Sequence, residues 1–180
     1  MVKTALSLVL WLVSLSSVYG GSDSPTSTAL VRVDPHPAPA VELSTLSNED
    51  YRLENYRNKV YLVHFWATWC TPCVKELPEL SGLQHDFDPN NFQIIAIAAD
   101  SHKAVREFLK KNQMALQPLI DQYGNAIHHY KAQAFPTTFL IDQKGMVRYQ
   151  AIGQVNWNAT EIRRAIGGLI AQVPGKEAPE

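Results

Sequence analysis

Two stretches of the chain are almost wholly apolar and contain no turn-forming residue. Residues 60–66 (VYLVHFW) and 92–99 (FQIIAIAA) are rich in β-branched, aromatic and small apolar side chains. Short continuous apolar runs of this kind are typical of strands that are buried on both faces of a sheet. The pattern therefore predicts two buried strands, with the first of them central in its sheet.

Apolar residues at three- and four-residue steps predict helices around these strands. Residues 72–87 carry such a stripe, and Pro78 is expected to kink the helix there. A second amphipathic helix is expected over residues 103–112, a short one around 125–130 and a last one over 158–171.

A hairpin is predicted between the last two helices. Residues 137–141 and 146–149 flank the turn sequence DQKG, which favours two antiparallel strands joined by a tight turn. A short strand is also expected over residues 116–120. Strands that alternate with helices and end in a hairpin and a helix predict an α/β fold with a mixed sheet.

The N-terminal residues have the features of an export signal. Lys3 precedes an apolar stretch over residues 5–15, and small or modest side chains stand at 18–20. This pattern predicts a secretory signal peptide over residues 1–20. The alternative is an uncleaved membrane anchor, since residues 4–20 reach the lower length limit for crossing a bilayer. Export places the chain in a bacterial periplasm or a similar space, where disulfides are permitted.

One domain is expected for a chain of 180 residues, and the composition indicates where it begins and ends. Residues 21–37 include a segment rich in Ser, Thr, Gly and Pro and are expected to form a flexible lead-in, with extended backbone through the prolines. The domain proper is expected to cover residues 38–173, and residues 174–180 are expected to be a disordered tail.

The charge balance argues against nucleic acid as a partner. The chain carries 16 Lys and Arg against 17 Asp and Glu, a net charge of −1. Proteins that bind nucleic acid usually present a basic patch or stripe to the phosphates. We therefore expect partners to be determined by a specific site.

The two cysteines of the chain, Cys70 and Cys73, stand where the first buried strand gives way to a helix. Pro72 suits the first helical turn, because it has no N–H to leave unpaired. The positive end of the helix favours the thiolate of Cys70 and so lowers its pKa. We expect Cys70 to attack a substrate disulfide and Cys73, one turn further in, to resolve the mixed disulfide.

Two other uses of this pair stay open on spacing alone. One is a stable disulfide that only cross-links the fold, although closing so short a loop removes little chain entropy. The other is a two-thiolate site for a soft metal such as Cu(I), since two ligands cannot complete a zinc site.

The surroundings of the pair resemble the thioredoxin superfamily. The sequence WATWCTPC (residues 66–73) follows the VYLVHF strand, and FPTTFLID (residues 135–142) stands roughly sixty residues later. The resemblance is narrower to the exported TlpA, ResA and CcmG class of disulfide reductases and covers roughly residues 38–170. It implies a thioredoxin-like α/β fold: a central mixed β-sheet flanked by helices, with a helix-and-strand insertion after the CxxC helix, around residues 80–99.

The resemblance also implies a substrate-binding loop. Pro136 matches the cis-proline of the family, which lies against the CxxC and offers backbone groups to an incoming substrate strand. Without the resemblance a trans bond would be expected, since most X-Pro bonds are trans. The expected substrate-binding residues are Trp69, Phe135, Pro136 and Thr137.

Glu76 matches the acidic residue that the narrower class places near its buried thiol. A carboxyl group buried there would have a raised pKa and would take the proton from Cys73 during resolution. From the residues alone, a solvated helix position is the alternative.

His64 departs from the family pattern. Thioredoxins have a buried Asp at this position, two residues before Trp66, and related exported reductases often have an amide. An imidazole would serve as a proton relay because it titrates near neutral pH. The favoured alternative is a core histidine that donates to a backbone carbonyl.

Together these features predict an exported thiol:disulfide oxidoreductase that reduces protein disulfides and uses neither a metal nor another cofactor. The resemblance implies reduction, and Thr71 and Pro72 include no His of the kind that strong oxidants carry between their cysteines. Clients would be apocytochrome c or copper-site proteins. A membrane thiol protein of the DsbD or CcdA type would supply electrons to a monomer. A disulfide oxidase or isomerase and a Cu(I) carrier are the alternative functions.

Overall fold

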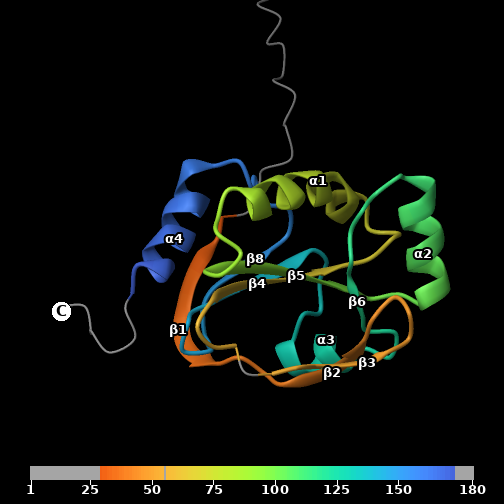
Figure 1. Cartoon of the computed structure of the whole chain (residues 1–180), viewed down its shortest axis with the longest axis horizontal. Coiled ribbons are helices and arrows are strands. Elements are labelled where there is room, and N and C mark those ends of the chain that lie inside the picture. The colour runs from red at the N-terminus through yellow and green to blue at the C-terminus, as the bar shows by residue number, and fades with distance from the viewer. Residues whose placement is uncertain (1–28, 55, 173–180) are drawn as a thin grey trace, which may run out of the picture.

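A mixed β-sheet with helices on both faces forms the structure, a computed structural model that describes residues 29–54 and 56–172 (Figure 1). Within these residues the strands are β1 (Val31–Pro37), β2 (Val41–Ser44), β3 (Asp50–Leu53), β4 (Val60–Trp66), β5 (Phe92–Ala98), β6 (Leu119–Ile120), β7 (Thr137–Ile141) and β8 (Met146–Ile152). The helices are α1 (Thr71–His85), α2 (His102–Lys111), α3 (Asn125–Tyr130) and α4 (Thr160–Ile170). The strand order is β1-β8-β7-β4-β5-β6-β2-β3.

Strand β4 lies inside the sheet, as its apolar sequence predicts. It pairs in parallel with β5 and antiparallel with β7. Six of its seven side chains are buried, so both of its faces are covered. Because β4 leads directly into the loop before α1, the position of the cysteines is fixed by a strand that is enclosed on both faces.

Helices α1, α2 and α4 cover one face of the sheet, and α3 covers the other (Figure 1). Leu80 and Leu83 of α1 share an apolar cluster with Ile166 of α4 and Leu62 of β4. On the opposite face Tyr130 of α3 belongs to a cluster with residues of β4, β5 and β7. Burying these apolar surfaces stabilises the fold by about 25 cal/mol for each Å² removed from water.

The predicted flexible lead-in does not extend through residues 31–37. These residues form β1, which pairs antiparallel with β8 at the edge of the sheet. The register shifts between Arg32 and His36, around Pro35. Proline lacks the N–H that a ladder needs and is tolerated at a sheet edge or an irregularity, so its presence did not exclude a strand. The predicted signal peptide, residues 1–20, and tail, residues 174–180, lie outside the described residues.

Residues 80–99, where the resemblance implies a helix-and-strand insertion, hold the end of α1 and strand β5. Helix α2 and strand β6 follow β5. The hairpin of β2 and β3 was not predicted, because four-residue strands carry too short a pattern to be distinguished from a loop. Among the helices of the described residues, none has the length and apolar character that crossing a membrane requires.

Gly145, in the turn between β7 and β8, is expected to resist substitution. Its φ is +79°, and a Cβ there would lie 2.9 Å from the backbone oxygen of Tyr56. Gly124 has a similar φ of +77° but no heavy atom within 4 Å of its Cβ position. Gly124→Ala should cost about 1–2 kcal/mol through its left-handed backbone, and Gly145→Ala should cost more, since the carbonyl must move. Urea unfolding of both variants tests this, and equal losses would contradict it.

Candidate active site

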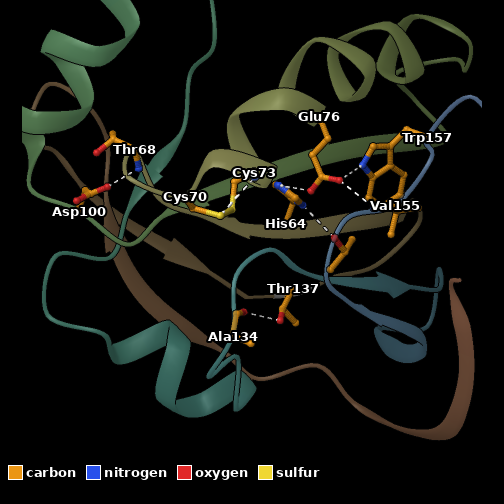
Figure 2. Close-up of a disulfide and its surroundings, with 11 residues drawn as sticks. His64, Thr68, Cys70, Cys73, Glu76, Asp100, Ala134, Thr137, Val155 and Trp157 are labelled. Atoms are coloured by element: carbon orange, nitrogen blue, oxygen red, sulfur yellow. Dashed lines mark hydrogen bonds and ion pairs between the residues drawn. A yellow bond between two sulfur atoms is a disulfide. The ribbon is translucent and has the colours of Figure 1, made fainter. Parts of the chain in front are cut away.

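Cys70 and Cys73 form a disulfide at the N-terminal end of α1 (Figure 2). Cys70 is the N-cap residue, and its Sγ accepts a hydrogen bond from the Cys73 backbone N–H at 3.3 Å. Cys70 keeps 6% of its surface exposed, whereas Cys73 is fully buried. Of the two sulfur-bearing residues, Cys70 is therefore the one that solvent reaches.

The loop that carries the disulfide is held to the end of the neighbouring strand. Asp100, just after β5, accepts a hydrogen bond from the Thr68 backbone N–H at 2.7 Å, and the Ala99 N–H donates to the Trp66 carbonyl at 2.9 Å. Asp100 was not among the predicted site residues. Since β4 and β5 are parallel neighbours, their carboxyl ends meet here and can be joined by one side chain.

The two tryptophans that flank the loop lie in different environments. Trp66 is fully buried in an apolar cluster that also contains both cysteines. Trp69 is 67% exposed, and its ring meets that of Phe135 edge to face at 5.7 Å between centroids. The exposed Trp69 ring, packed on a partly buried Phe135 beside the disulfide, offers an apolar surface to another molecule.

The loop before β7 lies next to the disulfide. The Phe135–Pro136 peptide bond is cis, as the family resemblance implies. Phe135 packs against the cluster that contains both cysteines. The loop is held by the Thr137 hydroxyl, which donates to the Ala134 carbonyl at 2.7 Å (Figure 2). The Pro136 carbonyl accepts a further hydrogen bond from the Gly153 N–H at 2.8 Å.

Glu76 is buried between α1 and the segment before α4, with 1% of its surface exposed. Its Oε2 accepts hydrogen bonds from the Val155 backbone N–H at 3.1 Å and the Trp157 indole N–H at 3.0 Å. Burial raises the pKa of Glu76 to about 7, although these two hydrogen bonds act in the opposite direction. The carboxyl group therefore exchanges its proton near neutral pH, and the alternative of a solvated helix position is wrong.

His64 is fully buried on β4, on the same side of the sheet as Glu76 (Figure 2). Its Nδ1 lies 2.9 Å from the Thr138 hydroxyl, and its Nε2 lies 3.5 Å from Glu76 Oε1. Burial lowers the pKa of His64 to about 3, so the ring is neutral over the physiological range. The expected bond to a backbone carbonyl is absent among the described residues; Thr138 stands directly opposite in the β4–β7 register and takes that place.

Trp157, Val155 and Thr138 contact the predicted acid and histidine but were not predicted themselves. Trp157 and Val155 lie in an irregular segment more than seventy residues from Glu76, and no spacing rule connects them. Thr138 belongs to the FPTT sequence and pairs with His64 across the sheet. A strand pairing inferred from the sequence would have identified Thr138, but no comparable signal exists for Trp157.

A family model described as the AhpC/TSA family matches residues 35–150, more than half of the chain. The chain belongs to this family. It is 36% identical over 121 residues to the thioredoxin-like protein YneN of Bacillus subtilis, covering 64% of this chain and 69% of YneN. It is 33% identical over 112 residues to the thiol-disulfide oxidoreductase ResA of Geobacillus thermodenitrificans, covering 62% of this chain and 64% of ResA.

A solved structure supports the same relationship. A DsbE-type thiol:disulfide interchange protein from Chlorobium tepidum superposes with a TM-score of 0.68 at 25% identity, over 79% of this chain and all of that one. With its Cys70–Cys73 pair, this AhpC/TSA member is a thiol-disulfide oxidoreductase of the ResA and DsbE type with a thioredoxin-like fold.

The raised pKa of Glu76 should be visible as a pH dependence of stability. Because this pKa is higher in the folded protein than in the unfolded chain, the stabilising contribution is complete below about pH 4.5 and is lost as the pH rises through about 7. Glu76→Gln removes this dependence while still offering an acceptor to Val155. The unfolding free energy of the oxidised wild type, relative to Glu76→Gln, should fall by about 3 kcal/mol between pH 4 and pH 8.

Urea unfolding at several pH values measures this difference. Glu107→Gln is the control, since it removes an exposed carboxylate from α2 and leaves the contacts of Glu76 in place; it should keep the pH dependence of the wild type. A difference between wild type and Glu76→Gln that does not change with pH would show that Glu76 does not titrate in this range.

Proposed function

We propose that the protein is a periplasmic reductase of protein disulfides, in which Cys70 attacks, Cys73 resolves and Glu76 accepts the proton of Cys73. The observation that carries this proposal is the asymmetry of the pair. Cys70 caps α1 and keeps a solvent-facing edge, whereas Cys73 is fully enclosed one helical turn from a buried acid. A stable cross-link would require neither the difference in access nor the acid.

In the first step, the reduced protein presents Cys70 as a thiolate. The N-terminal end of α1 and the Cys73 backbone N–H face this sulfur and stabilise its negative charge. The thiolate attacks one sulfur of a client disulfide, and the other client sulfur leaves as a thiolate. A mixed disulfide then joins Cys70 to the client.

In the second step, Cys73 resolves the mixed disulfide. Glu76 takes the proton of the Cys73 thiol, and the resulting thiolate attacks Sγ of Cys70. The second client sulfur leaves and takes up a proton. The client has gained two electrons, and the protein is left with the Cys70–Cys73 disulfide that the structure contains.

The client binds, in this proposal, across the exposed face beside the disulfide. Trp69 and Phe135 supply apolar contact, and the loop at Pro136 and Thr137 supplies backbone groups to an extended client segment. This loop enters β7 beside the carboxyl end of β4, where Thr137 pairs with Phe65, close to Cys70. Specificity would then depend on side chains that the redox chemistry does not use.

A reductant in an oxidising compartment must be reduced again after each cycle. We infer that a membrane thiol protein of the DsbD or CcdA type supplies the electrons, and that the clients are apocytochrome c or copper-site proteins. The protein acts as a monomer, either released by signal cleavage or held at the inner membrane by its N-terminal segment. The donor and the clients are those that the resemblance to the exported TlpA, ResA and CcmG class implies, and the apolar N-terminal sequence supports export.

Single replacements of the cysteines test the two roles. Cys73→Ser should accumulate mixed disulfides through Cys70, because nothing resolves them, whereas Cys70→Ser should accumulate none. Trapping in the native periplasm with acid quenching, followed by non-reducing electrophoresis and mass spectrometry, measures both and identifies the clients. Adducts that form in Cys70→Ser but not in Cys73→Ser would reverse the assignment.

The reduction potential tests the direction of electron flow. We expect a value near or below the roughly −270 mV of thioredoxin, far from the roughly −120 mV of strong oxidants. Equilibration in dithiothreitol redox buffers, read by tryptophan fluorescence from Trp66 beside the cysteines, gives this value. A potential near the oxidising end would make the protein an oxidase.

A further inference from the structure

The contact between His64 and Glu76 contains two buried polar atoms with no hydrogen-bond partner among the residues that the structure describes. These atoms are His64 Nε2 and Glu76 Oε1, and they face each other at 3.5 Å. The two side chains are 0% and 1% exposed, so bulk water does not satisfy them. Leaving buried polar atoms without a partner is energetically costly. A proton placed between them satisfies both at once.

The state of Glu76 determines which nitrogen of the neutral ring carries the proton. When Glu76 is ionised, Nε2–H donates to Oε1, and Nδ1 accepts from the Thr138 hydroxyl 2.9 Å away. When Glu76 is protonated, its O–H donates to a bare Nε2, and the ring proton moves to Nδ1, which then donates to Thr138. Each state of the acid therefore requires a different tautomer of His64.

We propose that His64 and Glu76 form one acid–base unit, in which one proton lies at the Nε2–Oε1 contact in both states of Glu76 and Thr138 changes between donor and acceptor. His64 is then a positioning residue that acts through Glu76. This inference rests on the proposed function, in which Glu76 receives the proton of Cys73, and it assigns to His64 the task of stabilising Glu76 both before and after that transfer.

An imidazole suits this position because it can hydrogen-bond to Glu76 in both protonation states of the acid without moving the ring. The ring is held by Thr138 on one side and lies edge to face with the Trp157 indole, at 6.3 Å between centroids. The same indole donates to Oε2 of Glu76. The carboxylate thus has donors at both oxygens when it is ionised, whereas its protonated form has an acceptor in Nε2.

Few other titratable groups face this unit from the elements packed around it. On α1 these are Cys73, when reduced, and Glu79, whose carboxylate accepts from the Trp157 backbone N–H. Strand β5 places Ala96 opposite His64, and β7 contributes only Thr138. Arg163 of α4 pairs instead with Asp86. In the reduced protein, Cys73 is therefore the group that this inference pairs with the unit.

Nitrogen-15 NMR of the oxidised protein, labelled at histidine, tests the unit in the absence of any client. We expect the ring to stay neutral from pH 5 to pH 9 and to change from Nδ1–H at low pH to Nε2–H at high pH, with its midpoint at the titration of Glu76. In Glu76→Gln the amide donates to Nε2, so the Nδ1–H form should persist at every pH. The proposal would be overturned if the tautomer of His64 did not change as Glu76 titrates, or if the ring were an imidazolium above pH 5.

Two variants at Thr138 provide a matched comparison. Thr138→Ser keeps the hydroxyl and should keep the tautomer change, whereas Thr138→Val leaves a buried Nδ1–H without an acceptor and should move the midpoint to lower pH. An unchanged midpoint in Thr138→Val would remove Thr138 from the unit.

The rate at which Cys73 resolves a mixed disulfide with glutathione on Cys70 gives an independent readout. His64→Phe keeps a ring but removes the donor to Oε1, so the midpoint of the pH–rate profile should rise by about one pH unit. A purely structural role would lower the rate at every pH and leave the midpoint in place. If Glu76→Gln does not slow resolution, the proposed role of Glu76 fails, whereas the tautomer measurement still decides the pairing of His64 with Glu76.

Discussion

A carboxyl group with no cation beside it is buried between α1 and the sheet, and the arrangement around the cysteines depends on how it is accommodated. Desolvation of an isolated carboxylate would cost far more free energy than the net stability of a small domain. The group therefore either stays protonated or accepts hydrogen bonds from nearby donors. Glu76 does both: its pKa rises to about 7, and Val155 and Trp157 donate to one oxygen. Neutral His64 faces the other oxygen.

These requirements constrain segments that are far apart in the sequence. The segment before α4 must pass over α1 closely enough for a backbone N–H and an indole to reach Glu76. Strand β7 must pair with β4 in the register that places Thr138 opposite His64. The same register delivers the cis-proline loop to the end of β4, next to Cys70. One sheet alignment therefore positions both the proton chemistry and the loop proposed to bind clients.

The parts of the fold that could be predicted from the sequence are those with a local signal. Strands β4 and β5 are continuous apolar runs, the β7–β8 hairpin has a turn sequence, and Cys70, Pro72 and Cys73 mark the start of a helix. The edge strand β1 was missed because Pro35 and Pro37 argue against a ladder, yet an edge needs hydrogen bonds on one side only. Trp157 was missed because its contact with Glu76 joins residues that are far apart in the sequence, and no regular spacing of residues indicates such a contact.

Burial of Glu76 could be inferred only by resemblance, since one acidic residue on a helix is more often solvated. The donors that adjust its acidity belong to the cluster under α4, where Trp157 packs, whereas Phe135 belongs to the clusters on the cysteine side and below the sheet. Substitutions at Trp69 or Phe135 would thus alter the proposed client surface and leave the donors to Glu76 in place. Conversely, a change at Trp157 would alter the surroundings of Glu76 and leave the Trp69–Phe135 pair in place. The fold therefore keeps the surface proposed for clients apart from the donors that set the acidity of Glu76, and the proposed reaction joins them at the disulfide.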